Sequence, residues 1–235
     1  MKVGDKYGSV FEMLKATTYN DALIASPENR DKVVEDYVRF IRLVHEVEMD
    51  RGELPEAKDV FLGYLDDLRD LLGEALYERL RMLFEAMPEN LHVVHGDIQM
   101  KNVMLSGDEP MLIDMDTLSV GDPVFDLMSL CVAYQLFNED EPDNAQKFLG
   151  ITNEMSDFVY EKTLACYFSE RDAAAVREAE KRIRIVAYVR FLFLVAVLGI
   201  GLTELKQVRV DHTLEHLREL LPQVDSLAVA RHDDH

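Results

Sequence analysis

The sequence is poor in the residue types that mark several protein classes. It has two cysteines in 235 residues, Cys131 and Cys166, and each lies in an apolar stretch. That is typical of buried free thiols and argues against a disulfide framework. Lys and Arg number 25 against 45 Asp and Glu, a formal net charge of −20. Nucleic-acid binding needs a basic surface, so we exclude a nucleic-acid partner. An excess of acidic residues keeps a protein soluble and slightly favours cationic ligands.

Targeting and membrane segments are also absent from the pattern. Residues 1–5 hold no cationic stretch followed by an apolar core, which predicts a cytoplasmic protein. The one long apolar run, 185–202, is interrupted by Arg190 and continues a charged helical pattern at 177–182. A helix buried on all sides in a large domain explains this run better than a membrane span does.

Hydrophobic periodicity predicts a mostly helical chain. Nothing in the sequence reads as a repeat or a Gly/Ser linker that would divide it. Apolar residues at three- and four-residue steps predict helices at 27–48, 65–87 (interrupted at Gly73), 123–137, 144–149, 154–168, 171–202 and 212–221. Residues 6–14 are β-like, 52–60 form a loop, and short apolar runs around a turn at 106–110 predict a hairpin over 103–113. The fold class is therefore α+β, mostly α, with a small β element in the middle.

Three polar residues flank the predicted hairpin: Asp97, Asn102 and Asp114. Their side-chain oxygens are hard ligands suited to Mg²⁺, which also takes phosphate oxygens. A carboxylate beside such a metal orients a hydroxyl and accepts its proton. This set predicts phosphoryl transfer, which depends on positioning and charge neutralisation. A zinc site of His92, His95 and Asp97 is the alternative, but no further histidine or cysteine cluster supports it.

The stretch from His95 to Leu127 carries a more specific pattern. His95-Gly96-Asp97 is followed by Asn102 five residues on, by Ile113-Asp114 after the hairpin, and by Gly121-Asp122-Pro123-Val124-Phe125-Asp126-Leu127. Together these motifs resemble the aminoglycoside phosphotransferase and choline kinase superfamily, which has a protein-kinase-like fold. Val10–Leu14 is similar to the hinge that connects the two lobes in that family. The resemblance extends over essentially the whole chain.

The resemblance implies a role for each matched residue. Asp97 would be the catalytic aspartate that accepts the proton of the substrate hydroxyl. Asn102 and Asp114 would be the Mg²⁺ ligands. His95 would brace the loop, and Asp126 would hold its backbone by hydrogen bonds from a helix start. The cofactors implied are Mg²⁺ and ATP or another nucleoside triphosphate.

The nucleotide would lie between the hinge and the hairpin. Backbone groups near Glu12 and Leu14 would contact adenine, and Met104 and Ile113 would form the floor of its pocket.

The roles of two polar residues near the loop remain open. Lys101 faces either phosphate or solvent, and Asp116 either reaches a second metal or caps the turn. The acceptor is expected to be a small hydroxylated molecule, and aminoglycosides, choline, homoserine and sugars all occur in such families.

The sequence departs from the family at its front. A family member carries about a hundred residues before the hinge, folded as a β-rich lobe, and here about ten precede it. We therefore expect residues 1–15 to be a residual lobe-connecting strand and hinge, and residues 16–235 to be the helical catalytic lobe of a truncated protein. Without the upper lobe we expect little or no transfer, because the phosphates lose electrostatic stabilisation. The exposed lobe-facing surface is expected to favour self-association. The alternative function is a non-catalytic kinase-like binding or regulatory module.

Overall fold

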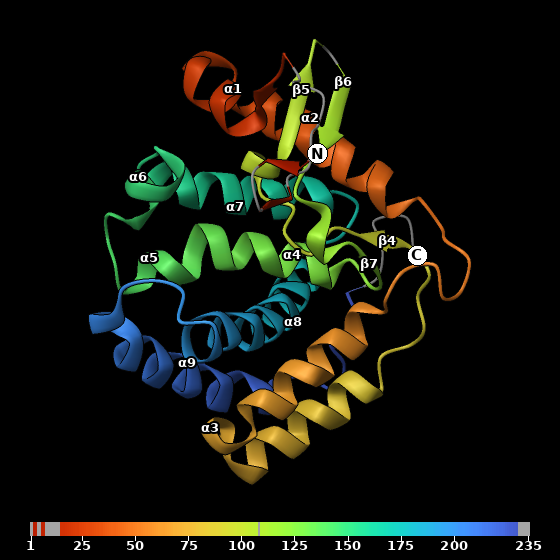
Figure 1. Cartoon of the computed structure of the whole chain (residues 1–235), viewed down its shortest axis with the longest axis vertical. Coiled ribbons are helices and arrows are strands. Elements are labelled where there is room, and N and C mark those ends of the chain that lie inside the picture. Colours follow the sequence, from red (N-terminus) through yellow and green to blue (C-terminus); the bar gives the residue numbers. More distant parts are fainter. Residues whose placement is uncertain (1, 4–5, 8–14, 108, 230–235) are drawn as a thin grey trace.

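The computed structural model describes residues 2–3, 6–7, 15–107 and 109–229, and this part of the chain is mostly helical (Figure 1). The α-helices are α1 (Tyr19–Ala25), α2 (Arg30–His45), α3 (Ala57–Glu85), α4 (Val124–Cys131), α5 (Phe137–Glu139), α6 (Asn144–Leu149), α7 (Asn153–Tyr167), α8 (Ala173–Leu192) and α9 (Lys206–Leu220). Two π-helical segments, η4 (Val132–Leu136) and η5 (Phe193–Val197), continue α4 and α8.

The strands are short and pair antiparallel in three places. β1 (Lys2–Val3) pairs with β2 (Lys6–Tyr7), and β4 (Val93–Val94) pairs with β7 (Ser119–Val120). β5 (Val103–Ser106) lies between β3 (Thr17–Thr18) and β6 (Glu109–Leu112). The predicted hairpin over 103–113 is therefore confirmed. Its register pairs Val103 with Leu112, which brings the residues just outside the hairpin, 102 and 113, together at its open end.

Helix α2 shows why the periodic segments fold as they do. Most of its apolar residues recur at helical spacing on the face towards the core; the buried ones are Val34, Tyr37, Val38, Ile41 and Val44. Pro27 opens a preceding 3₁₀ turn, η1 (Pro27–Asn29), because proline is tolerated at a helix start. The helix predicted at 27–48 therefore exists, and its last turn ends three residues earlier.

Helix α3 is broken where the sequence predicts it. Gly73 has φ 71° and ψ 160°, which is not helical, so α3 consists of two helical halves joined at a kink. The loop predicted at 52–60 is wrong in its second half, because α3 already begins at Ala57. Ala57 and Phe61 are buried, and this packing extends the helix back towards Pro55.

The helix predicted at 171–202 ends earlier than expected. α8 and η5 end at Val197, and Gly199 and Gly201 follow with φ of 69° and 96°, a conformation that suits glycine and stops a helix. The segment 197–202 is therefore an apolar loop whose Val197, Leu198 and Ile200 are exposed. α9 begins at Lys206 rather than at residue 212. No helix within the described ranges is both long and apolar enough to cross a membrane.

Helix α8 lies at the centre of the core. It packs against α4 on one side and against α3 and α9 on the other (Figure 1). Arg190, near the carboxyl-terminal end of α8, lines the same cavity as Gly96 and Asp97 of the loop between β4 and β5, so the site described below borders this end of the helix. Cys131 is buried and Cys166 is half-buried, and both are free thiols.

Candidate active site

The loop 95–102 connects β4 to β5 and includes the 3₁₀ turn η2 (Met100–Asn102). A buried carboxylate holds this loop. Asp126, in the first turn of α4, is fully buried. Its Oδ2 accepts a hydrogen bond from the backbone N–H of His95 at 3.0 Å, and its Oδ1 accepts one from Gly96 at 2.6 Å. Bonds to a charged acceptor are about twice as strong as neutral ones, so these two bonds fix where the loop begins.

His45 completes this network, and it is fully buried at the end of α2. Its Nε2 lies 2.9 Å from Oδ2 of Asp126 and its Nδ1 lies 2.8 Å from the Tyr167 hydroxyl. A carboxylate only accepts hydrogen bonds, so Nε2 carries the proton and Nδ1 accepts from Tyr167. Burial raises the pKa of Tyr167 well above its ordinary value, which keeps this hydroxyl a donor.

Three side chains from the helices bind the backbone of the loop itself. The Tyr37 hydroxyl of α2 donates to the carbonyl of Ile98. The Ser129 hydroxyl of α4 accepts from the N–H of Ile98 at 3.1 Å. The Tyr134 hydroxyl of η4 accepts from the N–H of Met100 at 3.2 Å. Because these groups are buried, each would cost free energy if left unpaired, so the loop has one well-determined conformation.

His95 connects the loop to the end of the hairpin. The N–H of Asp97 donates to its Nδ1 at 3.3 Å, so its proton is on Nε2, which donates to the carbonyl of Ile113 at 3.0 Å. Gly96 has φ 80°, and a Cβ there would lie 3.0 Å from the side chain of Thr117. The Thr117 hydroxyl in turn donates to the His95 carbonyl at 2.7 Å. The imidazole of His95 is thus occupied in holding two segments together.

Asp97 lies where the loop opens to a cavity, and two amides hold its carboxylate. Gln99 Nε2 lies 3.2 and 3.3 Å from its two oxygens, and Asn102 Nδ2 donates to Oδ2 at 2.9 Å. Burial raises the pKa of Asp97, while the bonds from Gln99 and Asn102 and the charge of Arg190 oppose that rise. The carboxylate is therefore fixed in orientation and set in a partly dry environment.

Asn102 and Asp114 both lie at the open end of the hairpin. The N–H of Ile113 donates to the Asn102 carbonyl at 3.0 Å, and Asp114 is the next residue after Ile113. Asp114 is exposed and has φ 59° and ψ 55°, and among the described residues it is the one non-glycine with a positive φ. Backbone strain of this kind costs about 1–3 kcal/mol and gathers at functional sites.

These two residues fit a magnesium ion. Asn102 uses its amide nitrogen on the carbonyl and carboxylate of Asp97, so its oxygen is the atom left for a cation. In the described part of the chain, no three His, Cys, Asp or Glu residues are grouped closely enough to hold a metal. Mg²⁺ commonly takes one or two protein oxygens and completes its shell with water and substrate phosphates, and an exposed Asp beside an Asn oxygen is such a donor set.

The remaining candidates lie at several places around the hairpin. Met104, on β5, and Ile113, just after β6, are both half-buried. Glu12 and Leu14 lie outside the described residues. Lys101 donates to the carbonyl of Phe148 at 2.7 Å and lies over its ring, so its ammonium group is engaged with α6.

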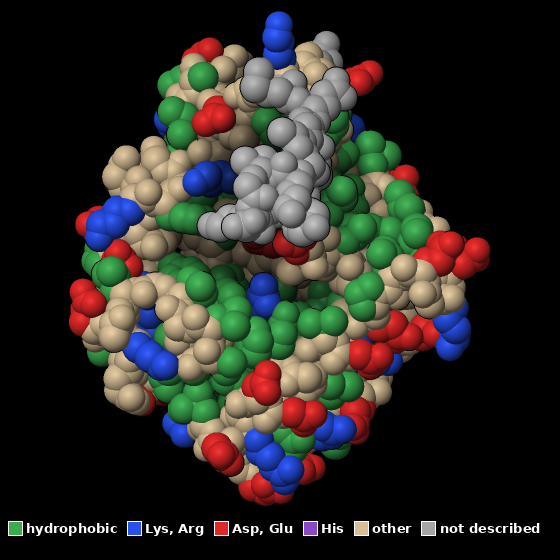
Figure 2. All heavy atoms as spheres, in the orientation of Figure 1, with side chains coloured by type: hydrophobic (Ala, Val, Ile, Leu, Met, Phe, Trp, Pro, Cys, Tyr) green, Lys and Arg blue, Asp and Glu red, His purple; other side chains and the backbone are tan. Residues whose placement is uncertain are grey.

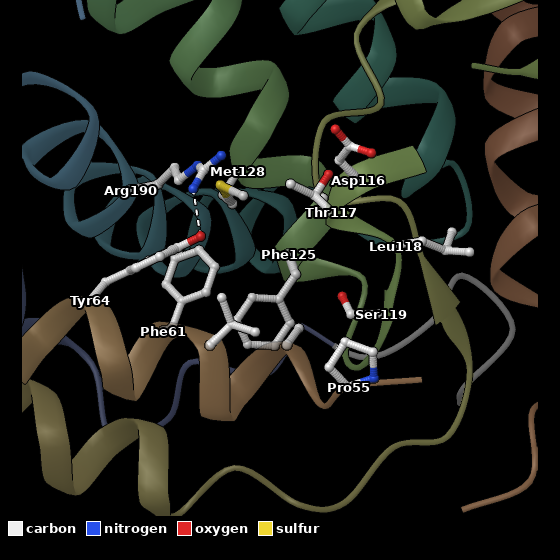
Figure 3. Close-up of a pocket in the computed structure, with 13 residues that line it drawn as sticks. Pro55, Phe61, Tyr64, Asp116, Thr117, Leu118, Ser119, Phe125, Met128 and Arg190 are labelled. Carbon is white, nitrogen blue, oxygen red and sulfur yellow. Dashed lines mark hydrogen bonds between the residues drawn. The ribbon is translucent and has the colours of Figure 1, made fainter. Parts of the chain in front are cut away.

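Asp116 is exposed within η3 (Met115–Thr117), at the edge of the cavity shown in Figure 3.

Two cavities border the loop, and the sequence interpretation identified neither. One, of about 130 Å³, lies between α3, α4 and the segment 116–119 (Figure 3). The other, of about 250 Å³, lies between the loop, η4, α6 and the end of α8 and contains Asp97 in its wall. Gly96 and Arg190 line both cavities. In the sequence, Arg190 is an interruption of an apolar run, and nothing in its sequence context indicates a cavity.

Comparison with known proteins identifies the family. The model of the phosphotransferase enzyme family, APH, matches residues 3–163, and the chain belongs to this family. No curated protein matches the chain. Among solved structures, a choline/ethanolamine kinase family protein from Mesorhizobium loti is 15% identical, with a TM-score of 0.49 over 89% of this chain and 67% of that one. A spectinomycin phosphotransferase solved with ADP and spectinomycin is 13% identical, with a TM-score of 0.41 over 92% of this chain and 67% of that one.

Proposed function

We propose that the chain is an ATP- and Mg²⁺-dependent phosphotransferase that acts on a hydroxyl group of a small molecule. Membership of the phosphotransferase family supports the reaction class. The observation that carries the proposal is the placement of Asp97, which is held by two amides in the wall of a cavity and is bonded to Asn102. Phosphoryl transfer asks for this combination of a positioned carboxylate and a cation site.

The proposed roles follow from the hydrogen bonds. Asp97 orients the acceptor hydroxyl and takes its proton, and its raised pKa makes it a better proton acceptor than an exposed aspartate. Gln99 and Asn102 fix the two carboxylate oxygens. Asp126 and His95 hold the loop and the end of the hairpin in register. When bound to Asn102 and Asp114, Mg²⁺ neutralises phosphate charge.

The nucleotide site and the lobe assignment belong to the same proposal. Met104 and Ile113 form the floor under adenine, and Glu12 and Leu14 supply hinge contacts. Residues 16–235 then correspond to the helical catalytic lobe and residues 1–15 to its hinge. Cytoplasmic location and self-association stay predictions, the latter measurable by sedimentation.

A nucleotide titration tests the metal site. We expect the chain to bind an ATP analogue more tightly with Mg²⁺ than with EDTA, because Asn102 and Asp114 would hold the ion and the ion would offset the phosphate charge. Asp114→Ala should remove this difference and lower the affinity in Mg²⁺ at least about tenfold, the effect of losing one charge-assisted contact. Asp67→Ala, an exposed carboxylate on α3, is the matched control. Equal affinities with Mg²⁺ and EDTA would contradict the proposal.

A transfer assay separates the enzyme from the non-catalytic module. The protein is incubated with ATP and a panel of hydroxylated metabolites, and product phosphate esters are measured. Asp97→Asn should retain nucleotide binding and lower any transfer about 10²–10⁴-fold, because it removes the proton acceptor. Little or no transfer by the chain alone stays a prediction, which measurable turnover would contradict. Transfer that survives Asp97→Asn unchanged would refute the role of Asp97.

A further inference from the structure

Among the described residues, one acidic and one basic side chain line the cavity beside Asp97. Its lining consists of Gly96, Asp97, Gln99, Ser129, Val132, Ala133, Phe137, Phe148, Arg190, Leu194 and Ile200. Asp97 is the only acidic residue of this set and Arg190 the only basic one. The rest of the wall is mostly apolar and includes two phenylalanines. Figure 2 shows hydrophobic side chains gathered around a hollow on this face, with a basic side chain among them.

Arg190 is held in place by a tyrosine. Its Nη1 donates to the Tyr64 hydroxyl at 2.6 Å, and its guanidinium lies 5.2 Å from the centre of the Tyr64 ring (Figure 3). Tyr64 is itself stacked on Phe193 with ring centres 3.9 Å apart. Within residues 15–107 and 109–229, Arg190 forms no ion pair. The guanidinium has five N–H donors in a planar fork, so most of them stay available to a ligand.

The charges in the cavity wall argue against the preference for a cationic ligand that the net charge of the whole chain suggests. The net charge of −20 favours a cationic ligand, but a cation in this cavity would lie beside Arg190 and would compete for Asp97. An acceptor whose hydroxyl lies at Asp97 places its other end among the apolar side chains or against Arg190. A partly buried guanidinium prefers an oxyanion, because the fork matches two oxygen atoms at once.

We propose that the acceptor carries an oxyanion that binds Arg190, an apolar body that contacts Val132, Ala133 and Leu194, and a hydroxyl presented to Asp97. This inference rests on the proposed function and names its substrate class. Tyr64 positions Arg190, so the recognition of the anion depends on α3 as well as on α8. A cavity of about 250 Å³ is large enough for a substituted benzene ring, since an apolar cavity of about 150 Å³ already holds benzene.

Probes that share a hydroxymethylphenyl body and differ in the charge-bearing group opposite the hydroxyl test this specificity. They are 4-(hydroxymethyl)benzoate, 4-(hydroxymethyl)benzamide, 4-(hydroxymethyl)benzylamine and 4-(hydroxymethyl)phenylphosphonate, each titrated into the full chain and followed by NMR. We expect the two anions to bind at least about tenfold more tightly than the amide, the value of one charge-assisted hydrogen bond, and the amine to bind most weakly. A preference between carboxylate and phosphonate then identifies which oxyanion the site takes.

Variants of Arg190 and Tyr64, with one control on α8, test which residue causes the preference for anions. Arg190→Gln should reduce the affinity for the anions about tenfold or more and leave the affinity for the amide unchanged, since only the charge-assisted bond is lost. Arg190→Lys keeps the charge without the fork and should restore part of the affinity. Tyr64→Phe should weaken anion binding by a smaller factor. Arg177→Gln, exposed near the start of α8 and about 20 Å from Arg190 at 1.5 Å per residue, is the control.

Three results would overturn the inference: equal binding of anion and amide, tighter binding of the amine, or no binding by either anion. The titrations are made without nucleotide, so their outcome is independent of the metal site. If the chain shows no Mg²⁺-dependent nucleotide binding but still binds the anions at Arg190, the proposed function is refuted and the anion site is kept. Normal nucleotide binding without anion preference would refute the substrate class alone.

Discussion

The buried carboxylate of Asp126 allows a quantitative prediction of the stability of the loop. Its two oxygens accept three hydrogen bonds, from the backbone of His95 and Gly96 and from the imidazole of His45. Asp126→Asn keeps the shape of the side chain and replaces one oxygen by an NH₂ group. The amide oxygen then serves the two donors at Oδ2, and the NH₂ group faces the N–H of Gly96.

The expected loss follows from these three bonds. One charge-assisted bond, to Gly96, disappears, which costs about 1.5–3 kcal/mol. The other two become bonds to a neutral acceptor and lose about 0.5–1 kcal/mol each. The sum is about 2.5–5 kcal/mol of unfolding free energy. With a slope near 3 kcal/mol per molar urea, the unfolding midpoint should fall by about 1–2 M.

Urea unfolding followed by circular dichroism measures this loss, and hydrogen exchange localises it. The amide protons of His95 and Gly96 should exchange faster in the variant. Asp36→Asn is the control, because Asp36 pairs with an Arg39 that is 70% exposed, and such pairs contribute no more than about 1 kcal/mol. A loss below about 1 kcal/mol for Asp126→Asn, or one no larger than the control, would refute the assignment of Asp126 as the anchor of the loop.

The remaining predictions concern glycine conformation and helix capping. Gly201→Ala places a Cβ 2.3 Å from Nη1 of Arg209 at φ 96°; because Arg209 is buried and cannot swing away, the variant should lose about 2–3 kcal/mol. Gly107→Ala, at φ 63° with no atom within 4 Å, should lose only about 1–2 kcal/mol, and equal losses in thermal unfolding would contradict the steric argument. Thr18→Ala removes the capping box with Asp21 and should cost about 1 kcal/mol in urea. Bonds from Thr18 lower the pKa of Asp21, so this contribution is present above the unfolded pKa of about 4 and disappears as pH falls through the folded pKa. A difference between wild type and Thr18→Ala that stays constant down to pH 2 would contradict this.

The features that the sequence predicts correctly have local causes. The hairpin over 103–113 follows from two apolar runs around a turn, and the break at Gly73 follows from the backbone freedom of glycine. The predicted bounds of helix α6 match the structure at both ends, because its periodicity and the glycine that follows, Gly150, indicate the same end of the helix. The positions of Asp97, Asn102 and Asp114 around the hairpin follow from the same local pattern, although their roles stay proposals.

What the sequence does not predict depends on contacts between distant segments. His45 lies 81 residues before Asp126, and a lone histidine at a helix end gives no sign of a buried partner. Arg190 lies in an apolar run, and the approach of α3, η4 and the loop 95–102 makes it part of two cavity walls. The net charge of −20 describes the whole chain and gives no information on which charged side chains line a cavity.

The way the loop 95–102 is held has a consequence for how such a protein can change over generations. Its backbone is bound by Tyr37, Ser129, Tyr134 and Asp126, which belong to α2, α4 and η4. Part of the cavity wall beside Asp97 comes from residues that form none of these bonds to the loop: Arg190 of α8, Leu194 of η5, and Ile200 in the segment that follows. Substitutions at these three residues change the shape and charge of the wall while the residues that hold the loop stay the same. Under the proposed function, a new acceptor can therefore be acquired without rebuilding the support of the loop 95–102.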